Sequence, residues 1–213
     1  MENLVKLCQH AKYTISIPDK QTCCGLPYFE KGELKTAKTI GEYNLEVFGN
    51  HSLVCGSPKC QDTFSQKYPK IFNNTVSHNQ SVSLARNTSG LGDLFRKLSI
   101  PNAAGISGRY FIIGHCQSPG MVSKEQLAMF ANCEWVFPEI EYGCCGAGTC
   151  MPTSNRELSY RMAMNLLQQA SSAKADYVVT MDDICRRHLI NVAAEHNLAI
   201  KTLHIIDIFA LAV

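Results

Sequence analysis

Two stretches of the sequence carry adjacent cysteines followed by glycine, Cys23-Cys24-Gly25 and Cys144-Cys145-Gly146. Adjacent cysteines do not easily form a disulfide with each other, because the small ring strains the peptide bond between them. They can instead present two thiolates to one metal centre, and the glycine lets the backbone turn through positive φ close to bulky inorganic atoms. Each Cys-Cys-Gly is therefore interpreted as part of a metal-thiolate site.

The composition indicates an ordinary globular protein, with 46% apolar and 18% charged residues and a net charge of +2. The sequence has no apolar run that could span a bilayer and no signal peptide, so we expect a cytoplasmic protein. In that reducing compartment, the 11 cysteines favour metal ligation over a disulfide framework, which remains the less favoured alternative. We expect no nucleic-acid partner, since basic residues are not interleaved with aromatic residues in a stripe.

Strands and helices alternate around these cysteines. Amphipathic helices are predicted at 31–48 and 155–172, a helix after Cys185 and a short one at 123–131, and strands at 13–17, 51–55, 109–114, 135–137, 175–180 and from 201. This order predicts an α/β fold with mainly parallel sheets, in which loops after the carboxyl ends of strands converge on one crevice. Thiols in those loops are therefore expected to lie close together.

The sequence also repeats itself. Cys24 and Cys145 are separated by 121 positions, and the segments 53–60 and 178–185 by 125. We interpret residues 1–68 as a first repeat, 69–108 as a connecting region and 109–213 as a second repeat. The expected architecture is two duplicated Rossmann-like βα halves.

With its two Cys-Cys-Gly elements and duplicated flanks, the sequence resembles the cysteine-rich CCG domain family, which includes the B component of heterodisulfide reductase. Each repeat ends in a single cysteine, Cys60 or Cys185, where other members have Cys-x-x-Cys, so the lactate-utilisation A type looks closest. The resemblance implies an iron-sulfur electron-transfer subunit of an oxidoreductase complex that converts L-lactate to pyruvate. It also implies partner proteins, one ferredoxin-like and of the B type, the other of the C type.

Carried over by this resemblance, the ligands of the second site are Cys116, Cys144, Cys145 and Cys185, and those of the first are Cys23, Cys24 and Cys60. Cys116 precedes Cys144 by 28 positions, and the same count back from Cys23 falls before the start of the sequence. The first repeat is therefore expected to lack its first strand and first cysteine. Cys55 or a water molecule could substitute, or the first site could be empty.

Thiolate ligands select either iron-sulfur clusters, here of the 4Fe-4S type, or zinc. One alternative is thus a zinc-stabilised interaction module, and another is a disulfide reductase like the B component of heterodisulfide reductase. His188, three positions after Cys185, could supply a nitrogen ligand. We assign no catalytic residue, because no Ser-His-Asp set, P-loop or dinucleotide-binding glycine motif is present.

Overall fold

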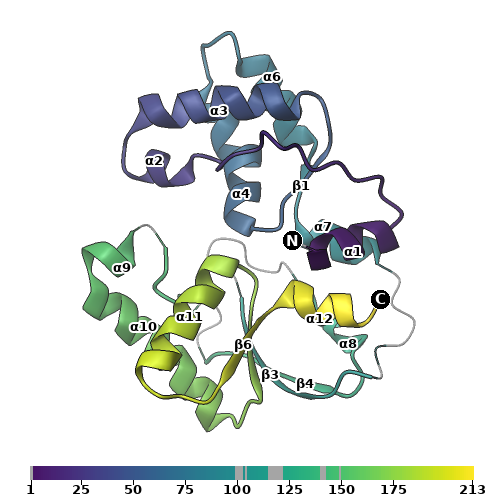
Figure 1. Ribbon diagram of the computed structural model, residues 1–213, viewed down its shortest axis with the longest axis vertical. Helices are drawn as coiled ribbons and strands as arrows, with labels where there is room; N and C mark the ends of the chain where they lie inside the picture. The colour runs from purple at the N-terminus through teal and green to yellow at the C-terminus, as the bar shows by residue number, and fades with distance from the viewer. Residues whose placement is uncertain (1, 99–102, 104, 115–121, 140–142, 149) are drawn as a thin grey trace. The chain divides into compact units, whose positions relative to one another are not determined.

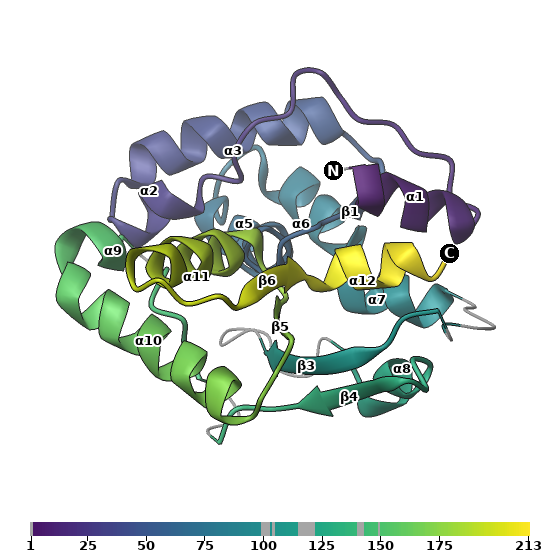
Figure 2. The same ribbon diagram turned by 60° about the horizontal axis from the view of Figure 1, so that its bottom comes forward.

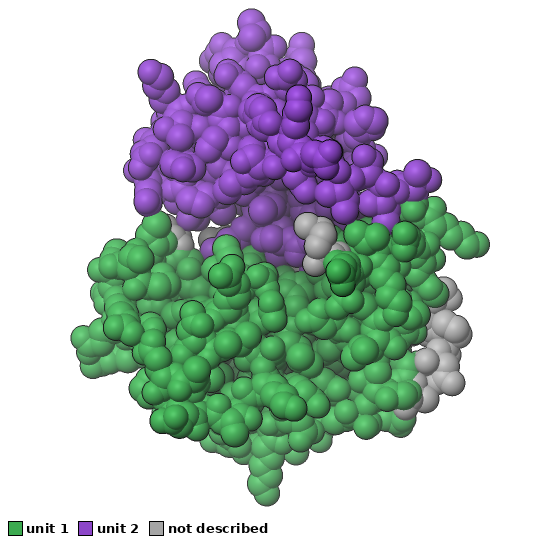
Figure 3. All heavy atoms as spheres, viewed as in Figure 1, with its two compact units in different colours: residues 1–13, 95–213 green, residues 14–94 purple. Residues whose placement is uncertain are grey.

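The computed structural model describes residues 2–98, 103, 105–114, 122–139, 143–148 and 150–213. The chain divides into two compact units, unit 1 with Met1–Tyr13 and Phe95–Val213, and unit 2 with 14–94 (Figure 3). Each contains a parallel sheet, four-stranded in unit 1 and two-stranded in unit 2. This confirms the predicted α/β class. None of the described helices is both long and apolar enough to cross a membrane.

The sheet of unit 1 has the strand order β4-β3-β5-β6 (Figure 1). Its strands are β3 (Gly108–Ile113), β4 (Cys133–Val136), β5 (Tyr177–Thr180) and β6 (Lys201–His204). After β3, the chain adds β4 on one side of it and then β5 and β6 on the other side. The strand order therefore reverses between β3 and β5, where Ile113 pairs with Thr180. In open α/β sheets, the carboxyl ends at such a reversal are the usual place for a ligand.

Helices cover both faces of this sheet. On one face, Phe111 and Val178 pack against α10 (Arg156–Ser172) and α11 (Asp183–Glu195), which lie side by side in Figure 2. On the other face, Phe209 of α12 (Ile205–Leu211) stacks on Phe95 of α7 (Leu91–Lys97) with ring centroids 4.0 Å apart. The remaining helices of the C-terminal part are α8 (Lys124–Ala128) and α9 (Met151–Ser154). The central strands β3 and β5 are therefore covered on both faces, which explains their largely apolar sequences.

The amino-terminal helix α1 (Glu2–His10) belongs to unit 1, because it packs on α12. Asn3 Nδ2 donates to Asp207 Oδ1 at 2.8 Å, and Lys6 Nζ donates to the Ala210 carbonyl at 2.7 Å. Leu7 is fully buried. Segments from opposite ends of the sequence thus share one fold.

Unit 2 is mainly helical. Its elements are α2 (Leu26–Glu30), α3 (Leu34–Phe48), β1 (Leu53–Val54), α4 (Pro58–Asp62), the π-helix η1 (Thr63–Lys67), α5 (Tyr68–Ile71), α6 (His78–Arg86) and β2 (Thr88–Ser89). The segments α4, η1 and α5 follow one another without a break, and Phe64, Tyr68 and Phe72 form a column of edge-to-face rings along them. This column and α3 form the core of the unit.

One local prediction was wrong. Residues 13–17 alternate β-branched and polar side chains but form no strand. The strand that pairs with β1 is β2, from the polar segment after α6. Alternation only makes a segment suitable for a sheet, whereas pairing requires a neighbour with free backbone groups. The predicted strand at 109–114, the helix at 155–172 and the strand at 175–180 are confirmed within a few residues.

Candidate metal-thiolate sites

The two Cys-Cys-Gly turns have the same local geometry. Gly25 has a φ of +84° and donates its N–H to Cys23 Sγ at 3.5 Å, while Gly146 has a φ of +79° and donates to Cys144 Sγ at 3.4 Å. Positive φ is costly for any residue with a Cβ atom, which explains the glycine that follows each cysteine pair. In both turns, the second cysteine is buried: Cys24 is 6% exposed and Cys145 3% exposed.

Each turn packs on a long helix further along the chain, the first on α3 and the second on α10. A Cβ atom on Gly25 would lie 3.5 Å from the Ala37 carbonyl oxygen of α3, whereas one on Gly146 would lie only 2.6 Å from the Ser159 carbonyl oxygen of α10. The second turn therefore tolerates no side chain at its glycine. The shared geometry supports the duplication inferred from the sequence.

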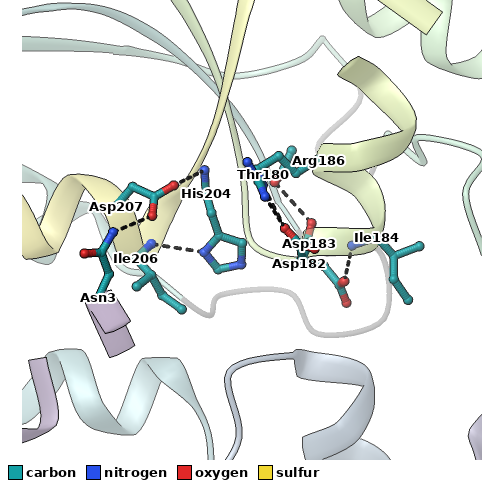
Figure 4. A network of polar contacts seen from close by, with 9 residues as sticks. All are labelled: Asn3, Thr180, Asp182, Asp183, Ile184, Arg186, His204, Ile206 and Asp207. Carbon is teal, nitrogen blue, oxygen red and sulfur yellow. Dashed lines mark hydrogen bonds and ion pairs between the residues drawn. The ribbon is translucent and has the colours of Figure 1, made fainter. Parts of the chain in front are cut away.

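The third cysteine of each set lies in the first turn of a helix. Cys60 is three positions after Ser57, the N-cap of α4, and Cys185 is three positions after Asp182, the N-cap of α11. The unpaired N–H groups at the start of a helix carry partial positive charge, which favours a thiolate there. Asp182 Oδ1 accepts the Ile184 N–H at 2.9 Å and so fixes the start of α11 (Figure 4).

In unit 2, the thiols of Cys24 and Cys60 share one proton. The pKa of Cys24 is lowered from 9.0 to about 6, mainly by the hydrogen bond from Cys60 and also by the Leu26 N–H, against the opposing effect of burial. The same hydrogen bond raises the pKa of Cys60, helped by burial. The pair therefore carries one negative charge at neutral pH.

In unit 1, Cys145 Sγ lies 2.7 Å from Cys185 Sγ and donates to it. The pKa of Cys145 is raised by its hydrogen bonds with Cys144 and Cys185 and by burial. Because the sulfur atoms are so close, they can ionise together only if a cation compensates the repulsion. The donors in both units are soft thiolates, which fit zinc or an iron-sulfur cluster. Among the described residues, no three His, Cys, Asp or Glu side chains are arranged to hold a single metal ion.

The other predicted residues have different surroundings. Cys116 lies outside the described residues. Cys55 is buried in the same apolar cluster as Cys24, and burial, with a smaller effect of the Cys24 charge, raises its pKa to about 12. His188 Nε2 lies 3.1 Å from Ser159 Oγ, so in the nitrogen-ligand alternative either this contact breaks or Nδ1 is the ligand.

A second polar feature lies at the carboxyl edge of the unit 1 sheet (Figure 4). His204 Nδ1 accepts the Ile206 N–H at 3.1 Å and Asp207 Oδ2 accepts the His204 N–H at 3.2 Å, so the pair caps α12. Burial lowers the pKa of His204, opposed by the nearby carboxylates of Asp207, Asp182 and Asp183. The imidazole is therefore neutral in this cap.

Sequence reasoning missed three buried polar residues that bind the two turns. Asn44 donates to the Cys23 carbonyl, Tyr68 to the Cys24 carbonyl and Ser159 to the Gly146 carbonyl, at 2.8, 3.1 and 2.7 Å. A signal was available, because Asn44 and Ser159 occupy the apolar stripes of α3 and α10. A polar residue in such a stripe needs a specific partner.

Several curated proteins are similar to this chain over nearly its whole length. "Lactate utilization protein A" of Oceanobacillus iheyensis is 24% identical over 217 residues, which cover 97% of this chain and 88% of that protein. The protein of the same name from Geobacillus sp. (strain WCH70) is 22% identical, with 96% and 89% covered. "Lactate utilization protein A 1" of Bacillus cereus (strain AH820) is 22% identical, again with 96% and 89% covered.

A sequence profile that describes a cysteine-rich domain, CCG, matches residues 1–65 and 115–190. The two matched segments contain both Cys-Cys-Gly turns and the helix-start cysteines Cys60 and Cys185. More than half of the sequence is covered, and the matched residues are those that bring the thiols together in each unit. The chain belongs to the CCG cysteine-rich domain family.

Proposed function

We propose that this protein is an iron-sulfur electron-transfer subunit of an oxidoreductase complex. The residues proposed to hold the clusters are Cys116, Cys144, Cys145 and Cys185 in one site and Cys23, Cys24 and Cys60 in the other. A bound cluster would supply one-electron redox chemistry at these positions. The protein would supply the thiolates, the N–H groups beside them and a partly buried environment.

One observation carries this proposal: each unit joins a Cys-Cys-Gly turn to a cysteine in the first turn of a helix. The thiols of Cys24 and Cys60 are hydrogen-bonded to each other, as are those of Cys145 and Cys185. Backbone N–H groups of Gly25 and Gly146 point at the neighbouring sulfurs. Such hydrogen bonds tune the reduction potential of an iron-sulfur centre.

The relatives named for lactate utilisation suggest the reaction of the complex. We propose that the complex oxidises a 2-hydroxy acid such as L-lactate to pyruvate, releasing two electrons and two protons per molecule. This chain would carry the electrons between partner proteins of the B and C types and need not bind the acid.

The test is analysis of iron and acid-labile sulfide, with electron paramagnetic resonance, on protein purified without oxygen. The wild type should contain iron and sulfide and give a reducible signal. C145S and C185S should lose most of the iron and sulfide of the unit 1 site, whereas C150S, which alters an exposed cysteine of the same unit, should keep it. Wild-type protein with iron at background level would contradict the proposal.

A zinc-stabilised interaction module is the second candidate. The closeness of Cys145 and Cys185 favours it, since two thiolates about 2.3 Å from one tetrahedral zinc ion lie about 3.8 Å apart, and the 2.7 Å contact would need to lengthen by only about 1 Å. In that case the wild type would contain zinc and show no visible absorption, and C145S would lose folded structure when zinc is lost.

A further inference from the structure

Two buried side chains hold the backbone of the first Cys-Cys-Gly turn. Asn44 of α3 donates through Nδ2 to the Cys23 carbonyl at 2.8 Å, and the Tyr68 hydroxyl at the start of α5 donates to the Cys24 carbonyl at 3.1 Å. The two side chains are also joined, because Asn44 Nδ2 donates to the Tyr68 hydroxyl at 3.1 Å. Consecutive carbonyls of the cysteine pair are thus fixed by one connected network.

The burial of Asn44 at this position has a cost in stability. It is 0% exposed, and its Oδ1 atom has no hydrogen-bond partner among the described residues. A buried polar atom without a partner is unfavourable, and an apolar residue would fill the same stripe of α3 without that cost. The amide is therefore better explained by its two donated hydrogen bonds than by packing.

Packing fixes the position of the Tyr68 ring. It stands edge-to-face between Phe64 and Phe72, with ring centroids 4.9 and 5.6 Å away. Gly41, one turn before Asn44 on α3, makes this possible, because a Cβ atom there would lie 2.7 Å from the Phe72 ring. A glycine inside a helix normally destabilises it, so the close contact explains its presence.

We propose that Asn44 and Tyr68 are positioning residues that hold the first thiol set in its binding geometry before any metal arrives. Because Asn44 and Tyr68 hold both carbonyls, the Cys24 thiol remains hydrogen-bonded to Cys60, and Cys23 Sγ keeps the hydrogen bond from the Gly25 N–H. This inference rests on the proposed function, because it takes the first thiol set to be the ligands of a metal.

The test compares Y68F and N44A with the control Y43F in the full-length chain. Tyr43 is the neighbour of Asn44 on α3, but its side chain is 41% exposed. Metal-free protein is treated with iodoacetamide, and the alkylation rate of each cysteine is followed by peptide mass spectrometry. Cys55 is the internal reference, because it is buried in the same core as Cys24 but lies on a different segment.

In Y68F and N44A, the alkylation rate of Cys24 relative to Cys55 should rise about fivefold, as expected for the loss of one buried hydrogen bond. Y43F should leave the ratio unchanged. A merely structural role would accelerate both cysteines together, so an unchanged ratio in Y68F and N44A would overturn the proposal. Circular dichroism identifies any variant that fails to fold, and the other variant then decides.

A second measurement separates this inference from the proposed function. Titration with Co²⁺ in the double variant C144S/C185S, which leaves only two of the four proposed ligands of the second set, is monitored through the sulfur-to-cobalt absorption band and reports on the first thiol set. Y68F in that background should bind Co²⁺ about fivefold more weakly. If C144S/C185S itself shows no band, the metal role of the first set is wrong, whereas the alkylation ratio still decides whether the two side chains position the turn.

Discussion

Replacing Gly146 by alanine should destabilise unit 1 and separate the thiols of the second set. The backbone term is about 1–2 kcal/mol, because an L-residue is strained at the φ of +79° found there. The steric term is about 1–3 kcal/mol, since the new Cβ atom would be 2.6 Å from the Ser159 carbonyl oxygen and one of the two segments must move. Together they predict a loss of about 2–5 kcal/mol in the free energy of unfolding.

Two matched variants separate these terms. Gly32 has a φ of +78° with nothing within 4 Å of its Cβ position, so G32A should show the backbone term alone. Gly25 has a φ of +84° and ordinary contacts at 3.4 Å and beyond, so G25A should resemble G32A. Both of these lie in unit 2, whereas Gly146 lies in unit 1.

The assay is urea denaturation of the full-length chain. Trp135 is the single tryptophan and lies in β4, so its fluorescence reports on unit 1, while circular dichroism reports on both units. G146A should also alkylate faster at Cys145, which is 3% exposed in the wild type. A loss in G146A no greater than that in G32A would refute the steric argument.

Three further predictions concern neighbouring groups. Absorbance of thiolates at 240 nm in metal-free protein should show one thiol, that of Cys24, ionising near pH 6. C60A, which has no donor at position 60, should remove that step, and an unchanged titration would exclude the hydrogen bond as its cause. Because the pKa of His204 is lowered in the folded protein, the unfolded chain binds a proton there more readily. The free energy of unfolding of unit 1 should therefore fall as the pH drops below 6.5. H204N retains a capping side chain and should weaken this pH dependence in urea denaturation at several pH values. S159A should lower the free energy of unfolding of unit 1 by about 1–3 kcal/mol, because the buried Gly146 carbonyl loses its hydrogen-bond donor. Urea denaturation followed by Trp135 fluorescence measures this loss, and a value near zero would mean that water replaces the donor.

The elements that carry the second site could be predicted from the sequence because their signals are local. The run Arg109–Gly114 is apolar enough for a buried strand, and the predicted helix at 155–172 begins beside Asn155, whose side chain accepts the Leu158 N–H. The glycine after each cysteine pair correctly predicted a turn through positive φ.

Other features depend on tertiary contacts. Phe64, Tyr68 and Phe72 recur every four positions, a helical signal that the surrounding polar residues obscured, and the π-helix within that run has no recognisable local pattern. Which polar residue binds which carbonyl, as Tyr68 does for Cys24, is decided only when α3 and α5 pack together. Fold class followed from periodicity, but the hydrogen bonds that shape the thiol sets did not.

The packing of α1 on α12 has a consequence for biosynthesis. Asn3 and Asp207 are 204 positions apart, and all of unit 2 is made between them. On the ribosome, α1 emerges early and its partner much later, so unit 2 can fold while α1 still exposes Leu7 to solvent. Joining the two helices then closes a very long loop, which slows this step relative to local folding. A nascent chain that stops before α12 should therefore leave α1 accessible to protease.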